Sequence, residues 1–295
     1  MNWTTEQIPP QENRIVIVTG ANSGIGFEIT KALVAKGATV IMACRNLDKA
    51  RQAAASLQKT VPNAKLDIIQ LDLADLASVK QFSETFNNKY SSLDLLINNA
   101  GIMIPPFGKT KDGFELQFGS NHLGHFALTR LLLERLKTTP KARVINVSSS
   151  AHRLGKGAID FENLNADKGY SAMNAYSQSK LANVLFTLEL NQYFQKHKID
   201  ATANAAEPGL TATNLLEGIP RFVIGLFAQP AAMGALPILF AATANEVKAN
   251  DYFSPNGFIQ LKGYPRKFAL SAASRDEEVA KRLWKVSEEL TGVHF

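Results

Sequence analysis

The fold is decided by the stretch Arg14-Ile-Val-Ile-Val-Thr-Gly-Ala-Asn-Ser-Gly-Ile-Gly-Phe27. Its first apolar residues are β-branched and too few for a helix, which is typical of a buried parallel strand. Glycines follow, and a helix-forming segment begins behind them. Gly20 turns sharply off the strand, Gly24 lets a phosphate approach the backbone, and Gly26 lets helix and strand pack closely. Backbone N–H groups and the positive end of the helix dipole meet at this turn, so the stretch predicts a dinucleotide site.

Short apolar runs alternate with helix-forming segments along the rest of the chain, a rhythm that requires a parallel sheet. After residues 15–18, the expected strands are 39–43, 66–71, 93–97, 143–147, 199–205 and a last one near 257–261. The expected helices include 46–60, 75–89, a long stretch from about 114 to 137, 174–197 and a closing amphipathic helix at 276–290. There is no internal repeat or linker. We therefore predict an α/β fold: a single doubly wound Rossmann domain over residues 1–295, with a mainly parallel seven-stranded sheet, helices on both faces, and residues 1–13 as an N-terminal arm.

The composition, 45% hydrophobic and 20% charged, is that of an ordinary globular protein. A single cysteine, Cys44, excludes an intramolecular disulfide framework and favours a cytoplasmic location. Residues 1–14 lack the pattern of a signal or transit peptide. The net charge is +6, but Lys and Arg are dispersed among acids, so we expect no nucleic-acid partner. The uncharged segment 222–245 is interrupted by glycine, proline and glutamine, which favours a buried helix after an apolar loop over a transmembrane span.

Polar residues and glycines gather where the expected strands end, at Thr19-Gly20, Arg45, Asp72, Asn98 to Gly101, Ser148 to Ser150 and Pro208-Gly209. Ligands of parallel sheets bind at these carboxyl ends. Arg45 ends the second strand, and the nearest carboxylate, Asp48, falls inside the next helix. An acid at this place accepts from the ribose 2′-OH of NAD, whereas a cation pairs with the 2′-phosphate of NADP. The sequence therefore predicts NADP(H).

Tyr176 and Lys180 are four residues apart in a predicted helix and so share a face. A phenol titrates near pH 10, and a neighbouring ammonium group lowers that pKa. Tyr176 could then act as acid toward a carbonyl, or as base toward an alcohol, while a hydride passes to or from nicotinamide. A serine hydroxyl from residues 148–150 could donate to the same substrate oxygen. His122 and His125 lack a cysteine or carboxylate neighbour, so we expect no metal site.

Taken together, these residues form an ordered motif set that covers nearly the whole chain. The motifs are Thr19-Gly20-xxx-Gly24-Ile25-Gly26, Asn98-Asn99-Ala100-Gly101, Asn121, Ser149, Tyr176-xxx-Lys180 and Pro208-Gly209-xxx-Thr213. In this order they resemble the short-chain dehydrogenase/reductase family. The local patterns Ala-Cys-Arg-Asn and Tyr-Ser-Gln-Ser-Lys-Leu-Ala-Asn resemble its retinol dehydrogenase-like branch.

The resemblance implies a role for each motif residue. Tyr176 would be the acid/base, Lys180 would hold the nicotinamide ribose and lower the tyrosine pKa, and Ser149 would polarise the substrate oxygen. Asn121 would carry a water-linked proton relay to Lys180. The implied cofactor-binding residues are Gly20, Asn22, Ser23, Gly24, Ile25, Gly26, Arg45, Asp72, Leu73, Asn98, Ala100, Gly101, Tyr176, Lys180, Pro208, Gly209, Thr211 and Thr213. Ser149 is chosen among its neighbours by the Ser-Ser-x-Ala-His pattern. The family often pairs subunits through its long helices, which suggests a homodimer, although this branch also includes monomers.

The family places a substrate lid at about residues 209–230, which are rich in Leu, Ile and Phe here. An apolar lid favours an aldehyde, a ketone or a retinoid-like substrate. The predicted function is therefore an NADP(H)-dependent oxidoreductase that transfers a hydride between nicotinamide and such a carbonyl or alcohol. Three alternatives remain open. A nucleotide-sugar epimerase would need a larger domain than residues 210–295, and a protochlorophyllide reductase would not place its lone cysteine at the nucleotide end. A non-catalytic NADP(H)-binding sensor or scaffold would not need Tyr176 and Lys180.

Overall fold

Strand β1 (Ile15–Thr19) lies inside the sheet, where it pairs in parallel with β2 (Thr39–Cys44) and β4 (Leu95–Asn98). Val16 and Val18 pack into one hydrophobic cluster, and Ile17 packs into another on the opposite face. Side chains of a strand alternate between faces, so both faces of β1 are buried. An unbroken apolar run in the sequence is what this position requires.

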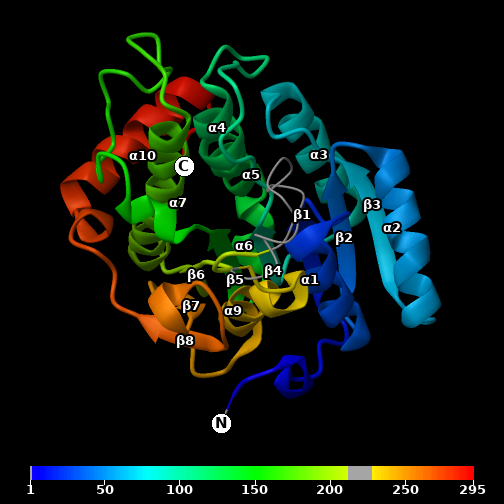
Figure 1. Cartoon of the computed structure of the whole chain (residues 1–295). Helices are drawn as coiled ribbons and strands as arrows, with labels where there is room; N and C mark the ends of the chain where they lie inside the picture. The colour runs from blue at the N-terminus through cyan, green and yellow to red at the C-terminus, as the bar shows by residue number, and fades with distance from the viewer. Residues whose placement is uncertain (1, 212–227) are drawn as a thin grey trace.

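The computed structural model describes residues 2–211 and 228–295. Within them the sheet has eight strands in the order β3-β2-β1-β4-β5-β6-β7-β8 (Figure 1). The remaining strands are β3 (Lys65–Gln70), β5 (Ala142–Val147), β6 (Ala201–Ala206), β7 (Tyr252–Pro255) and β8 (Pro265–Phe268). All neighbouring pairs are parallel except β7 with β8. The predicted doubly wound Rossmann domain is confirmed, and its last two strands, β7 and the antiparallel edge strand β8, flank the segment where the seventh strand was predicted.

The strand predicted near residues 257–261 is wrong. That segment contains the 3-10 turn η5 (Phe258–Gln260) and connects β7 to β8. Gly263 adopts a φ of +120°, and the N–H of Tyr264 donates to Oδ1 of Asn256, so the backbone turns back here instead of extending. Phe258 is 85% exposed. Its apolar character, which suggested a buried strand, therefore does not reflect burial.

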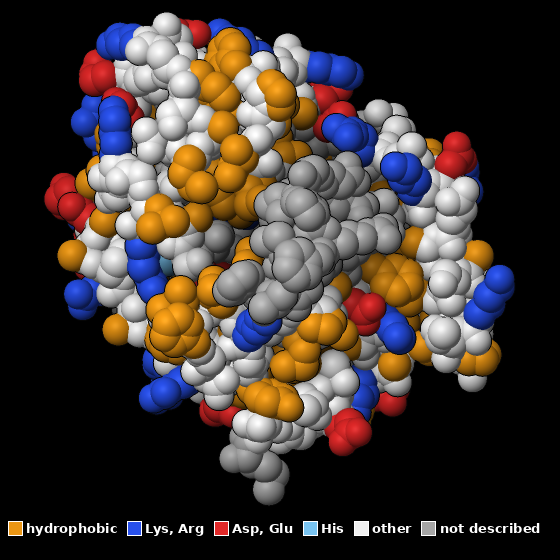
Figure 2. All heavy atoms as spheres, viewed as in Figure 1, with side chains coloured by type: hydrophobic (Ala, Val, Ile, Leu, Met, Phe, Trp, Pro, Cys, Tyr) orange, Lys and Arg blue, Asp and Glu red, His pale blue; other side chains and the backbone are white. Residues whose placement is uncertain are grey.

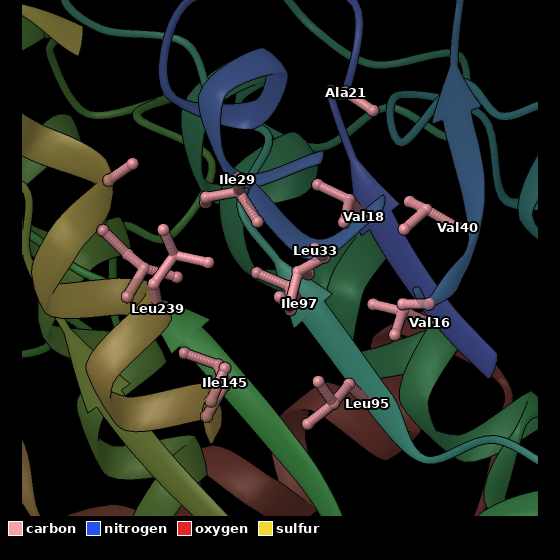
Figure 3. Close-up of a cluster of buried hydrophobic side chains, with 14 of the residues drawn as sticks. Val16, Val18, Ala21, Ile29, Leu33, Val40, Leu95, Ile97, Ile145 and Leu239 are labelled. Carbon is pink, nitrogen blue, oxygen red and sulfur yellow. The ribbon is translucent and has the colours of Figure 1, made fainter. Parts of the chain in front are cut away.

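Helices cover both faces of the sheet. On one face lie α1 (Gly24–Ala35), α2 (Leu47–Thr60) and α9 (Ala231–Thr243); on the other lie α3 (Leu76–Lys89), α5 (Gly124–Leu131), α6 (Leu133–Thr138) and α7 (Ala172–Lys196). Figure 3 shows Ile29 and Leu33 of α1 and Leu239 of α9 packed over the sheet residues Val16 and Ile97. Burying one such side chain stabilises the fold by about 1.5–3 kcal/mol.

The closing helix α10 (Glu277–Thr291) packs against α7. Its Trp284 lies in an aromatic cluster with Phe186 of α7 and the C-terminal Phe295. Part of the predicted uncharged segment 222–245 is the buried helix α9, as expected. Among the described residues, no helix is both long and apolar enough to cross a bilayer.

The long helix expected from about 114 to 137 is divided. It consists of α4 (Leu116–Phe118), the π-helical turn η2 (Gly119–Leu123), α5 and α6. A Cβ at Gly124 would lie 2.5 Å from the backbone oxygen of Leu73, so the helix can cross the β3–α3 loop this closely only at a glycine. The turn η2 carries Asn121, and π-helical turns of this kind are frequent at functional sites. Shorter 3-10 turns are η1 (Thr5–Gln7), η3 (Ser150–Arg153) and η6 (Ala273–Arg275).

Candidate active site

A cavity of about 390 Å³ opens at the carboxyl ends of the parallel strands, beside the turn between β1 and α1. Most of the predicted cofactor residues line it: Gly20, Asn22, Ser23, Gly24, Ile25, Gly26, Arg45, Asp72, Leu73, Ala100, Gly101, Tyr176, Lys180 and Pro208. The order of strands reverses beside β1, since β2 and β3 lie on one side of it and β4 on the other. The cavity therefore lies at the topological switch point, where open α/β sheets bind their ligands.

The glycine-rich turn has the shape predicted for a phosphate site. Gly20 and Gly24 adopt φ angles of +68° and +53°, which residues with a side chain rarely adopt. A Cβ at Gly26 would lie 2.3 Å from the oxygen of Gly20, so α1 can approach β1 only with glycine here. Ser23 is the N-cap of α1, but its side chain does not cap the helix. The first N–H groups of α1 can therefore bind an anion.

A buried polar network fixes this turn to the rest of the site. Oγ1 of Thr19 accepts from the N–H groups of Asn99 (2.9 Å) and Ala100 (2.8 Å) and lies 3.0 Å from Nε2 of His125. Nδ1 of His125 lies 3.0 Å from the backbone oxygen of Asn121, which can only accept, so Nδ1 carries the proton and Nε2 accepts from Thr19. Burial lowers the pKa of His125 to about 4 and keeps the ring neutral. The network joins β1, the end of β4 and the turn η2.

Arg45 follows β2 directly and is exposed at the cavity. Asp48, the acid nearest to it in sequence, pairs with Arg51 at 2.8 Å, and no ion pair involves Arg45 among residues 2–211 and 228–295. Cys44 is buried, and burial raises its pKa to about 11, which fits the predicted role of a small filler at the strand end. A cation thus stands at the place where NAD sites have an acid.

The predicted catalytic pair lies at the inner end of the cavity, on α7. Tyr176 is 8% exposed, and the neighbouring Ser149 hydroxyl, which accepts from the N–H of Ala151 (3.3 Å), favours the phenolate of Tyr176. Nζ of Lys180 lies 5.7 Å from the centre of the Tyr176 ring and donates to the backbone oxygen of Val147 (3.1 Å). Ser148, by contrast, is buried and donates to the backbone oxygen of Lys180 (2.8 Å). The cavity lining includes Ser148 and not Ser149, whereas Ser149 is the serine that affects the Tyr176 phenol.

Burial dominates the acid–base properties of this pair. It raises the pKa of Tyr176 to about 12, although Ser149 opposes the shift, and it lowers the pKa of Lys180 to about 8. Lys180 is not among the groups that shift the Tyr176 pKa here, so the lowering of that pKa by Lys180 stays a prediction. Tyr176 is protonated at neutral pH, the state in which it can donate a proton.

Asn121 binds the loop that follows β4. Its Oδ1 accepts from the N–H of Ile102 (2.9 Å), and its Nδ2 donates to the oxygen of Ile102 (3.0 Å) and to Oγ of Ser179 (3.0 Å). A Cβ at Gly101 would lie 3.2 Å from Oδ1 of Asn121 and 3.3 Å from Nζ of Lys180. Both polar groups therefore border the space beside Gly101.

Comparison with known proteins gives the family. A family model for short chain dehydrogenase matches residues 14–222. The chain belongs to the short-chain dehydrogenase/reductase family. It is 40% identical to retinol dehydrogenase 12 of Mus musculus over 299 residues, covering 99% of this chain and 90% of the relative. It is 39% identical to retinol dehydrogenase 11 of Homo sapiens over 297 residues, covering 98% and 88%.

Solved structures agree with this family. An uncharacterized protein from Mycobacterium paratuberculosis superposes with a TM-score of 0.84 at 38% identity, over 100% of this chain and 99% of that one. A short chain dehydrogenase from Shigella flexneri complexed with NADP superposes with a TM-score of 0.65 at 23% identity, over 83% and 97%, and this likeness shows the fold alone. The chain is thus an oxidoreductase of the short-chain dehydrogenase/reductase family, in the retinol dehydrogenase-like branch that its motifs predicted.

Three predicted cofactor residues that the structure describes, Asn98, Gly209 and Thr211, are outside the cavity lining of this short-chain dehydrogenase/reductase. Asn98 is 1% exposed, and its Nδ2 donates to Oγ1 of Thr129 (3.2 Å) and Oδ1 of Asn146 (2.8 Å), so its side chain serves the core and not the predicted cofactor contact. Oγ1 of Thr211 donates to the backbone oxygen of Pro208, which closes the turn around Gly209. Thr213 and most of the predicted lid lie outside the described residues.

The cavity of this short-chain dehydrogenase/reductase also includes residues that the prediction missed: Ala43, Leu71, Ala74, Asn99, Ile102, Leu116, Ser120, Val147 and Ser148. Many of them end a strand or directly follow one, so the rule that ligands meet the carboxyl ends of strands could have found them. Leu116 belongs to α4 and Ser120 to the π-helical turn η2, and the sequence did not predict that the helix is divided there.

Proposed function

We propose that this protein is an NADP(H)-dependent oxidoreductase that interconverts a carbonyl and an alcohol of an apolar small molecule. The observation that carries the proposal is that Tyr176 and Lys180 line a cavity that begins at a phosphate-binding turn, with Ser149 acting on the phenol of Tyr176. NADP(H), when bound, supplies or accepts the hydride. The chain itself contributes binding, orientation and the proton.

The residues around the cavity fit such a cofactor. The turn from Gly20 to Gly26 would bind the pyrophosphate through the backbone N–H groups at the start of α1. Gly26 allows α1 to lie this close to the turn, since a Cβ at Gly26 would lie 2.3 Å from the oxygen of Gly20. Arg45 would pair with the 2′-phosphate. Asp72 would meet the adenine, and Lys180 would hold the nicotinamide ribose, since both line the same cavity.

In the reductive direction, Tyr176 would donate its proton to the substrate oxygen as negative charge develops there. The Ser149 hydroxyl would donate a hydrogen bond to the same oxygen and so stabilise that charge. Lys180 and Asn121 border the space beside Gly101, where a proton relay to Tyr176 could run. A phenol that remains protonated at neutral pH suits reduction more than oxidation.

Exposed hydrophobic side chains in loops at the carboxyl edge of the sheet support an apolar substrate. The most exposed large hydrophobic side chains of the described residues lie in segments that leave the carboxyl edge of the sheet or, for Met173, begin α7: Ile104, Phe107, Leu154, Met173, Phe258 and Ile259. Figure 2 shows hydrophobic side chains in several patches on one face of the molecule. Exposed apolar patches of sufficient area are typical of binding surfaces.

The proposal is tested by following NADPH oxidation over a panel of apolar and polar aldehydes and ketones, with NADH in parallel. We expect turnover with apolar carbonyls, a preference for NADPH, and little turnover with short polar aldehydes. Tyr176→Phe serves as the blank. NADPH binding without turnover of any carbonyl or alcohol in the panel would favour the non-catalytic sensor instead.

A further inference from the structure

The backbone oxygen of Ser149 accepts two hydrogen bonds from a single residue, His152. The N–H of His152 donates to this oxygen over 2.9 Å, and Nδ1 of its ring lies 2.6 Å from the same oxygen. A carbonyl oxygen can only accept, so Nδ1 carries the proton and Nε2 is an acceptor. The contact with Ser149 thus fixes the tautomer of His152. The proposed reaction steps give this histidine no role.

The His152 ring has one polar anchor. His152 is 1% exposed, and its ring meets the Tyr252 ring of β7 edge-on, with ring centres 5.5 Å apart. Nε2 is buried and has no hydrogen-bond partner among the described residues. Burial lowers the pKa of His152 to about 4, so the ring is neutral at neutral pH. The hydrogen bond from Nδ1 to Ser149 is therefore the polar contact that orients the ring.

A second cavity, of about 80 Å³, borders the ring on the side of α7. His152 lines this cavity together with Ser177, which follows Tyr176 and whose buried hydroxyl also lacks a partner among the residues described. The cavity has room for about two or three water molecules, since each takes about 30 Å³ in the liquid. Nε2 can therefore be hydrated while Nδ1 stays bonded to Ser149.

The two hydrogen bonds constrain the backbone from which the Ser149 side chain projects. Ser149 is the N-cap of η3, with extended φ and ψ angles of −157° and 151°, and the position of its carbonyl oxygen depends on that ψ. The Ser149 hydroxyl itself has only a long contact, from the N–H of Ala151 at 3.3 Å. A group that stabilises charge in a reaction has to be held within about 0.5 Å by such supporting hydrogen bonds.

We propose that His152 is a positioning residue, whose Nδ1–H holds the backbone of Ser149 so that the Ser149 hydroxyl reaches the substrate oxygen. This inference rests on the proposed function, in which Ser149 donates to that oxygen. The alternative is that His152 only fills space against Tyr252.

Two substitutions at this position separate the alternatives. His152→Asn keeps an N–H donor close to the place of Nδ1 but removes most of the ring, and the neighbouring cavity lets water fill the space. His152→Phe keeps an aromatic ring against Tyr252 but removes the donor. His197→Phe is the matched control, because His197 is an exposed histidine just past the end of α7 that also packs on a tyrosine, Tyr193, with ring centres 4.3 Å apart.

The readouts are kcat and KM for reduction of an apolar aldehyde under saturating NADPH, with Tm as the measure of packing. We expect His152→Phe to lower kcat by about 10- to 100-fold with little change in KM, and His197→Phe to leave both unchanged. We expect His152→Asn to retain kcat within about threefold of wild type despite a lower Tm. The reverse order, with kcat kept in His152→Phe and lost in His152→Asn, would overturn the inference.

A double-mutant cycle tests whether His152 acts through Ser149. Adding His152→Phe to Ser149→Ala should cause no further loss of kcat, because the hydroxyl that His152 positions is already gone. Losses that multiply would mean that His152 acts by another route and would overturn the inference. Unchanged turnover in Ser149→Ala would instead refute the role that the proposed function gives to Ser149.

A last measurement needs no turnover. NMR of the wild-type protein labelled with 15N at histidine distinguishes the two tautomers, and we expect His152 to carry its proton on Nδ1. A proton on Nε2 would overturn the inference, since Nδ1 could not then donate to Ser149. This measurement also applies if His152→Phe does not fold. A protein that reduces no carbonyl but carries the proton on Nδ1 would refute the proposed function and leave the contact between His152 and Ser149 established.

Discussion

Replacing Gly26 with alanine is expected to weaken NADP(H) binding by about 100-fold while most of the fold survives. The added Cβ would lie 2.3 Å from the oxygen of Gly20 and 2.7 Å from Nδ2 of Asn99, whereas ordinary contact begins at 3.4 Å. The difference, 3.4 minus 2.3, requires a shift of about 1.1 Å between α1 and the turn. Overpacking of this kind costs about 1–3 kcal/mol, of which better helix propensity restores up to about 1 kcal/mol.

The shift moves the N–H groups that would bind the pyrophosphate. Losing two hydrogen bonds to a charged group, at about 1.5 kcal/mol each, weakens binding by about 100-fold. NADPH fluorescence titration measures the affinity, and thermal unfolding without ligand measures the fold, for which we expect a decrease in Tm of only about 3–6 °C. Gly108→Ala is the control, since its Cβ would lie 3.4 Å from Cδ2 of Leu116, an ordinary contact. Wild-type NADPH affinity in Gly26→Ala would refute the assignment of this turn.

Further predictions concern charge and pH. Arg45→Ala is expected to weaken NADPH binding by about 10- to 100-fold and NADH binding hardly at all, as measured by competition titration; equal losses would remove Arg45 from the phosphate site. Burial lowers the pKa of His122 to about 3 and those of His125 and His152 to about 4, below the value of about 6.5 in an unfolded chain. The unfolded chain then binds more protons, so stability is lost as pH falls below about 6.5, by about 2 kcal/mol per histidine between pH 7 and 5. Urea unfolding at both pH values checks this, and equal midpoints would contradict neutral burial of these rings.

The fold could be predicted at positions where the local backbone conformation and the tertiary packing both require the same type of residue. Gly26 is required by the close approach of α1 to β1, and the apolar run of β1 by burial on both faces. Prediction failed where contacts between residues distant in sequence determine the local structure. The sequence around Gly124 does not indicate that this residue packs against the backbone of Leu73. Phe258 is as apolar as a core residue, although it is exposed.

The same distinction explains the site. Tyr176 and Lys180 could be found because a helix fixes their spacing, but the effect of burial on their pKa values depends on the whole enclosure. Asn98 lies in a correctly predicted motif, yet its side chain faces Asn146 on the neighbouring strand and not the cavity. The cytoplasmic location and the homodimer depend on properties beyond one folded chain and stay predictions.

The central claim is that the hydroxyl of Tyr176 transfers the proton while the rest of the site binds the cofactor. The most direct measurement compares the wild-type protein and Tyr176→Phe for NADPH affinity and for turnover of an apolar aldehyde under saturating NADPH. We predict NADPH affinity within about twofold of wild type and turnover lower by about 10²-fold or more. Turnover that survives the loss of this hydroxyl would contradict the account.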